Sequence, residues 1–176
     1  IPEKKRASGL FVQDIALDMR RLFSVSLNPL EPEISSEIEA ELRENSWIEG
    51  ENAFGPCLIA PPEMREELIP AMVSAILNWR ITSNQSRTFS LMETLAVSVS
   101  DNANKIAGSI RAKLTESEKA IPIVEEGMPG VEMFVTLPAS GYLVTKQESA
   151  DALDRAQAHL ESLLRAFPYE SQLMPT

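Results

Sequence analysis

The sequence predicts a mainly α-helical protein: a bundle-like single domain of about five helices with one small β-hairpin. Three observations predict this fold class. The core must be built largely from aliphatic side chains, because 44% of the residues are hydrophobic but only 6% are aromatic. Apolar residues recur at steps of three and four over most of the chain, which indicates amphipathic helices. A hairpin pattern occurs once, at about 131–146.

The length of 176 residues is that of one ordinary domain. We expect three regions along it. Residues 1–8 form a basic, flexible arm, residues 9–167 form the helical domain, and residues 168–176 form a C-terminal tail.

The first two helices are expected at 9–24 and 36–45. Apolar residues fall at helical spacing in the first segment, and a proline-containing break follows it. Ser36 is the preferred N-cap of the second helix, because Glu39 completes a capping box three residues later. Ser35 is the weaker candidate for this N-cap. Most of the surface of this second helix is acidic.

The third helix is expected to begin at Pro62, after a loop at 47–56 and a short apolar run at 57–60. Pro70 either kinks this helix or marks its true start. We expect a single core face on this helix. It comprises Leu68, Ile69, Met72, Val73, Ile76, Leu77 and Trp79.

The longest helix is expected at about 86–120, with an apolar seam whose steps alternate between three and four residues. This repeat keeps one helix face turned toward a partner helix. The partner is either another helix of the same bundle or a second subunit, so the seam is a candidate interface. The seam comprises Phe89, Met92, Ala96, Val99, Ala103, Ile106 and Ile110.

A strand at 95–100 followed by a shorter helix is the alternative for this segment, because apolar and polar residues alternate there. Asp101 would then cap the shorter helix. We prefer one long helix, since seven seam positions match the helical template. Gly108 opposes it, at a cost of about 1 kcal/mol inside a helix.

The hairpin and the last helix complete the expected fold. Residues 131–137 alternate like a strand, and 142–145 form the return strand after a Pro- and Gly-containing loop. Thr145 and Glu148 make a capping box for the last helix, which extends to Phe167 before a proline.

The charge distribution suggests where a partner binds. The net charge of −10 disfavours a general nucleic-acid binder, yet Lys4, Lys5 and Arg6 make the N-terminal arm basic. Residues 31–51 carry eight acids and one base. We expect acids of the helix there, Glu37, Glu41 and Glu44, either to be solvated or to bind a basic partner, such as the arm of a neighbouring subunit. Nucleic acid is a partner only through the arm.

Candidate chemistry is sparse. The single histidine, His159, and the single cysteine, Cys57, exclude histidine–cysteine metal clusters and triads that need a second such residue. We therefore expect no catalytic residue, metal or cofactor. No stretch is apolar enough to span a membrane. One cysteine fits a reducing compartment, such as the cytoplasm, or a virion.

The sequence favours a non-catalytic structural or assembly protein that acts through protein–protein contacts. Such a protein could be a homo-oligomer, a component of a viral or phage shell, or a subunit of a large complex. An acidic regulatory or chaperone-like module that binds a basic segment is the first alternative. An enzyme with carboxylate-based chemistry is the second, and a deep pocket with convergent polar groups would distinguish it.

Overall fold

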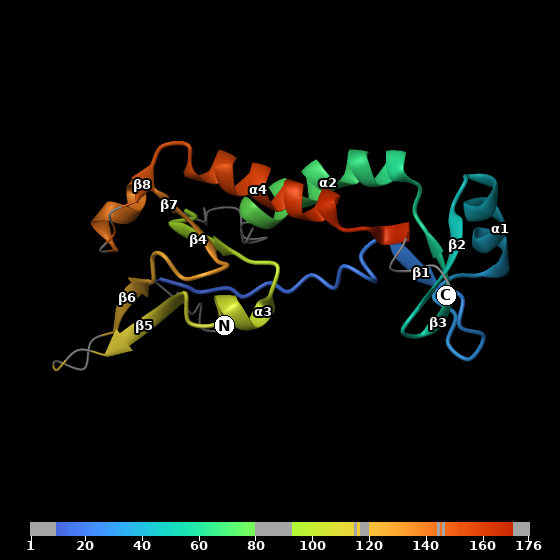
Figure 1. The fold of residues 1–176 in the computed structure, drawn as a ribbon, viewed down its shortest axis with the longest axis horizontal. Coiled ribbons are helices and arrows are strands. Elements are labelled where there is room, and N and C mark those ends of the chain that lie inside the picture. The colour runs from blue at the N-terminus through green and yellow to red at the C-terminus, as the bar shows by residue number, and fades with distance from the viewer. Residues whose placement is uncertain are drawn as a thin grey trace, which may run out of the picture. The chain divides into compact units, whose positions relative to one another are not determined.

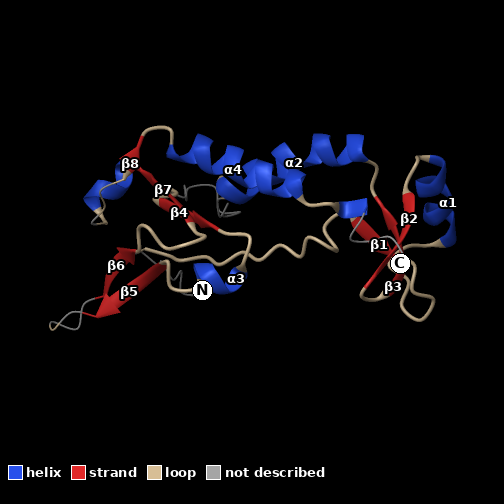
Figure 2. Ribbon diagram, in the orientation of Figure 1, coloured by secondary structure: helices blue, strands red, loops and turns tan. Residues whose placement is uncertain are grey.

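The computed structural model describes residues 10–79, 93–114, 116, 120–143, 145 and 147–170. Within these residues the chain has four α-helices and eight strands in three sheets, with 35% helix and 24% strand (Figures 1 and 2). The expectation of a mainly α-helical protein with one hairpin is therefore wrong. The protein is a mixed α/β protein.

The described residues form two compact units. Unit 1 contains 10–16 and 93–156, and unit 2 contains 17–79 and 157–170. The division falls inside helix α4, Ala152–Ala166, directly after Ala156.

Unit 2 contains an antiparallel sheet with the order β1-β3-β2. Strands β2 (Ile48–Asn52) and β3 (Gly55–Ile59) form a hairpin, and β1 (Ser24–Ser26) pairs with the other edge of β3. The apolar end of β3 is completely buried, because it is the central strand. The expected loop at 47–56 is thus a strand and a turn, with the positive φ of 107° at Gly55 allowing the chain to reverse.

Helix α1 (Ser36–Glu44) lies close to its expected position and leads into β2 (Figure 1). Its N-cap is Ser35 and not Ser36: the Ser35 hydroxyl accepts a hydrogen bond from the backbone N–H of Ile38. No residue of α1 is buried, so the helix is held at the surface of unit 2.

Helix α2 (Pro62–Leu77) begins at the expected proline, whose fixed φ suits the first helical turn. Pro70 lies inside the helix and does not mark its start. Ile69, Val73 and Leu77 are buried along one side. The C-terminal part of α4 lies beside α2 in unit 2 (Figure 1), and Arg165 of α4 pairs with Glu66 of α2.

The expected helix at 9–24 is absent. Residues 10–18 have no regular structure, a turn follows, and the chain then enters β1. Amphipathic spacing stabilises a helix only when the apolar face is covered. Four apolar residues of this segment are instead exposed: Leu10, Phe11, Val12 and Ile15.

Unit 1 contains a sheet with the order β4-β7-β8 and the separate hairpin β5-β6. Strands β4 (Ala96–Val99) and β7 (Glu132–Thr136) are antiparallel, and the short β8 (Glu148–Ser149) is parallel to β7. Strands β5 (Ile110–Leu114) and β6 (Ala120–Val124) form the second sheet. The core of this unit includes Val124, Met133, Val135 and Ala139.

The expected long helix at 86–120 is the largest error. In its place stand β4, the four-residue helix α3 (Ala103–Ile106) and β5. β-Branched valines in β4 favour a strand. Gly108 has a φ of 85°, a backbone conformation that cannot occur inside a right-handed helix. The alternative of a strand and a shorter helix describes this segment better.

The expected hairpin is half correct. Strand β7 lies inside 131–137, but a 3₁₀ helix, Leu137–Gly141, occupies the expected loop, and residues 142, 143 and 145 do not form the expected return strand. The partners of β7 are β4 and β8. Thr145 does not cap the last helix, since α4 begins only at Ala152, and its hydroxyl donates to Glu126 at 2.6 Å.

Candidate functional site

The seam residues do not share one helix face. Ala96 and Val99 belong to β4, Ala103 and Ile106 to α3, and Ile110 to β5, while Phe89 and Met92 lie outside the described residues. Val99 is buried and Ile110 packs against the core of unit 1. The five described seam residues therefore do not form one helical surface, and an interface role for them stays a prediction.

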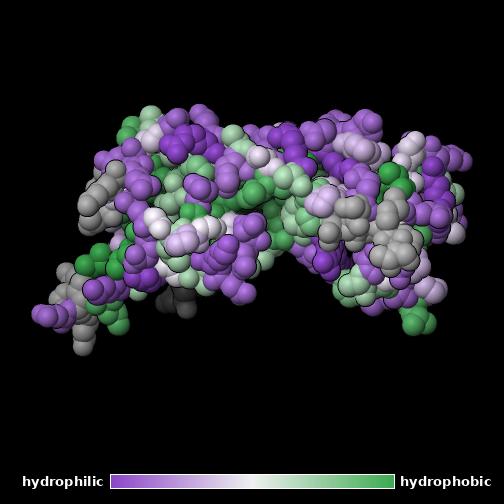
Figure 3. Space-filling model, viewed as in Figure 1, coloured by the Kyte–Doolittle hydropathy of each residue, from purple (hydrophilic) through white to green (hydrophobic). Residues whose placement is uncertain are grey.

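The acids expected to bind a partner are accessible. Glu37, Glu41 and Glu44 are all exposed on α1, where hydrophilic side chains gather in Figure 3. A hydrogen bond from the Ser35 side chain lowers the pKa of Glu37. The basic residues Lys4, Lys5 and Arg6 lie outside the described part of the chain.

Unit 2 carries most of the acidity of the protein. Over the whole of unit 2, residues 17–92 and 157–176, fourteen acids and seven Lys or Arg residues give a formal charge of −7, out of −10 for the whole chain. Such a surface attracts basic segments and repels acidic ones.

An apolar groove of about 520 Å³ lies within this acidic unit. We call it the unit 2 groove. One wall comes from the residues around β1, the other from α2, and the residues Trp47 and Ala60, next to β2 and β3, complete it. Its lining includes Leu22, Val25, Trp47, Met64, Leu68 and Met72.

Helix α2 forms the groove because it is apolar on two sides. Ile69 and Val73 are buried in unit 2, whereas Met64, Leu68 and Met72 line the groove. Leu68 remains 46% exposed. A helix that is apolar beyond one stripe is usually covered on both sides, so the groove side of α2 lacks part of its cover.

Trp47 adds a polar group to the apolar lining. Its indole Nε1 is buried and has no hydrogen-bond acceptor among the described residues. Buried donors of this kind are uncommon, and each costs about 1–3 kcal/mol when it stays unpaired.

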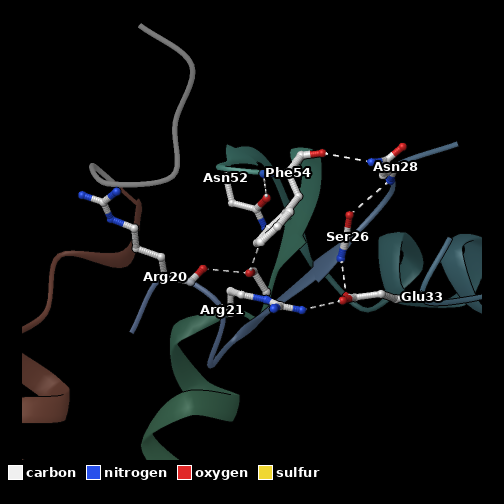
Figure 4. A network of polar contacts seen from close by, with 8 residues as sticks. Arg20, Arg21, Ser26, Asn28, Glu33, Asn52 and Phe54 are labelled. Atoms are coloured by element: carbon white, nitrogen blue, oxygen red, sulfur yellow. Dashed lines mark hydrogen bonds and ion pairs between the residues drawn. The ribbon is translucent and has the colours of Figure 1, made fainter. Parts of the chain in front are cut away.

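A polar network fixes the wall of the groove that includes β1 (Figure 4). The Glu33 carboxylate accepts hydrogen bonds from the backbone N–H of Ser26 at 2.7 Å and from Arg21 at 3.1 Å. The Arg21 guanidinium also lies over the Phe54 ring, 4.8 Å from its centre. The Asn28 side chain donates to the Phe54 carbonyl. These contacts connect β1 to the β2-β3 turn.

A second, polar cavity of about 260 Å³ lies between α2 and the end of the chain's last helix. Its charged groups pair with one another: Arg65 with Glu170, and Arg165 with Glu66. The hydrogen bond from Arg65 lowers the pKa of Glu170. We assign this cavity a structural role, since its ionic groups already satisfy each other.

Two further reactive side chains in the described part of the chain are Cys57 on β3 and His159 on α4. Cys57 is 1% exposed, and burial raises the pKa of its thiol, which is the opposite of nucleophile activation. His159 is half-buried on α4. The described residues contain no group of three or more His, Cys, Asp or Glu side chains that could hold a metal ion.

Sequence patterns did not reveal the groove. Leu68 and Met72 were assigned to the same core face as Ile69 and Val73, but the structure divides these residues between two sides of α2. The available signal was the breadth of the apolar surface between 62 and 77, which exceeds one helical stripe.

Within the described residues, every helix is too short or too polar to cross a bilayer. The chain matches no protein-family model. Searches of curated proteins and of solved structures likewise find no match to it.

Proposed function

We propose that this protein is non-catalytic and acts by binding a protein segment in the unit 2 groove. The observation that supports this proposal most strongly is the apolar groove, which belongs to a unit with a formal charge of −7 and is lined in part by the half-exposed Leu68. The groove volume is in the range of sites that bind discrete ligands.

Covering the groove supplies the free energy of binding. Completing the burial of one leucine side chain contributes about 1 kcal/mol, and several groove residues gain cover together.

The chemistry of the groove defines the partner. Apolar side chains fit the walls, and basic residues beside them fit the exposed acids of α2, such as Glu67. Charge attraction between exposed groups mainly speeds association, so binding weakens as salt is added.

A fluorescence titration tests the proposal. The chain has two tryptophans, and a Trp79→Phe variant leaves Trp47 of the groove as the single reporter. The probe is a synthetic 14-residue peptide of leucine and lysine with an amphipathic pattern. We expect a saturable change in Trp47 emission that high salt weakens, and no change with a matched leucine–glutamate peptide.

Substitutions locate the binding. Leu68→Asp places a charge in the groove at a position that is 46% exposed, so the fold should tolerate it while peptide binding falls at least tenfold. Leu30→Asp is the matched control, since Leu30 is 92% exposed in the same unit and does not line the groove. Equal binding by both variants would refute the proposal.

A further inference from the structure

We propose that the segment bound in the unit 2 groove is residues 10–15 of a second copy of this chain. This inference rests on the proposed function and names the partner of the same groove. It makes the protein self-assemble through two different surfaces.

The donor segment is unusually apolar for an exposed stretch. The exposed fractions are 47% for Leu10, 66% for Phe11, 56% for Val12 and 40% for Ile15. Scattered exposed apolar residues are ordinary, but four within six positions make a contiguous patch typical of an interaction surface. These residues form neither helix nor strand, so the segment can adapt to a groove.

The unit 2 groove can cover the exposed apolar side chains of this segment. The segment belongs to unit 1 and the groove to unit 2. An extended run of six residues spans about 20 Å and can place several of its apolar side chains along one wall.

Charge supports the same pairing. Lys4, Lys5 and Arg6 precede the apolar segment in the sequence, and the receiving unit carries a formal charge of −7. Exposed Glu63 and Glu67 lie on α2, the helix that forms one groove wall.

The two surfaces differ, so the contact is head-to-tail. Each copy would donate one segment and receive another, and such assemblies close into rings or extend as filaments. Blocking the segment on one copy and the groove on another should therefore leave one functional contact between them.

A mixing experiment with the full chain tests this inference. Phe11→Asp breaks the segment and keeps the groove, whereas Leu68→Asp breaks the groove and keeps the segment. Light scattering coupled to size exclusion should show wild type above the 19.4 kDa of one chain, with mass that rises with concentration. Each variant alone should remain at one chain, and their equimolar mixture should form a dimer.

Leu30→Asp is the control and should assemble like wild type. Assembly of Phe11→Asp on its own, or a mixture that stays at the mass of one chain, would overturn the inference. A wild type that is monomeric throughout while Trp47 still reports leucine–lysine peptide binding would reject self-assembly and keep the proposed function. Failure of both peptide binding and assembly would reject the two together.

Discussion

The guanidinium of Arg65 and the carboxylate of Glu170 form an ion pair although 105 positions separate them in the chain. The same guanidinium donates to the Ala60 carbonyl at 2.7 Å and lies 4.8 Å from the centre of the Tyr169 ring. Arg65 is buried, so it joins the start of α2 and the end of β3 to the residues that follow α4. This side chain stabilises the unit that contains the groove.

Replacing Arg65 with methionine should lower the free energy of unfolding by about 2 kcal/mol, because the Ala60 carbonyl and Glu170 lose their donor. This loss of stability is smaller than the loss expected for a fully buried ion pair, because the Glu170 side chain is 40% exposed. Urea denaturation measures the change. Arg165→Met is the matched control, and its exposed ion pairs should leave the midpoint nearly unchanged. Equal effects of the two substitutions would contradict this role of Arg65.

The Tyr169 phenol should ionise at a higher pH than an exposed tyrosine. Burial raises the pKa of its phenol to about 12, and its hydroxyl donates to the Leu164 carbonyl at 3.0 Å. Because the phenol ionises near pH 10 in an unfolded chain, stability is unaffected by this group below pH 10 and is lost as pH rises from 10 to 12.

Absorbance at 295 nm in a Tyr142→Phe variant follows Tyr169 alone, since the chain has two tyrosines. Circular dichroism records whether the chain is still folded at each pH. Phenolate formation at pH 10 in folded protein would show that Tyr169 is not buried as described.

The thiol of Cys57 should be protected in the folded protein. It is 1% exposed in the central strand β3, and burial raises its pKa, so the reactive thiolate is scarce and inaccessible. A thiol-reactive dye should modify the native chain far more slowly than the chain in 6 M guanidinium chloride. Rapid modification under native conditions would contradict the placement of β3 in the core of unit 2.

Gly130 should resist replacement by alanine. Pro129 and Gly130 are the central residues of a turn closed by the Val131 N–H and the Met128 carbonyl at 3.1 Å. The φ of 75° at Gly130 gives it type II geometry, which disfavours a side chain by about 1 kcal/mol.

An added Cβ at Gly130 would also lie 2.6 Å from Lys105 Nζ, so the lysine would have to move. Gly127→Ala is the matched control, because Gly127 has a φ of 79° and open space around it. Thermal unfolding should show a lower midpoint for both variants. The decrease for Gly130→Ala should be at least as large as the decrease for Gly127→Ala. An unchanged midpoint for Gly130→Ala would contradict the turn.

Local signals predicted the elements that depend on local contacts. The start of α2 follows from Pro62, and β7 follows from the alternation at 131–137. The position of α1 was also predicted to within one residue at its C-terminal end, although its cap was placed one residue late. In each case the deciding residues are neighbours along the chain.

Long-range pairing explains the principal failure. Ala96 and Val99 have helical spacing, but β4 is a strand because it pairs with β7, where Ala96 faces Val135. No periodicity within 86–120 contains information about β7. The preference for helix therefore followed the local pattern where tertiary pairing decided the outcome.

The groove lay beyond prediction for a related reason. The spacing of apolar residues predicts that both Leu68 and Ile69 belong to a core face. It does not show that β1, Trp47 and α2 leave Leu68 partly uncovered. The basic arm and the acidic residues of 31–51 were recognisable from sequence, and their roles as partner-binding residues stay predictions.

Amide hydrogen exchange of the full chain, with and without saturating leucine–lysine peptide, tests the location of the binding site most directly. We expect slower exchange at 22–25 and 64–72, which flank the groove, and unchanged exchange at 132–136 in the other unit. Protection confined to residues outside 22–25 and 64–72 would contradict the assignment of the unit 2 groove as the protein-binding surface.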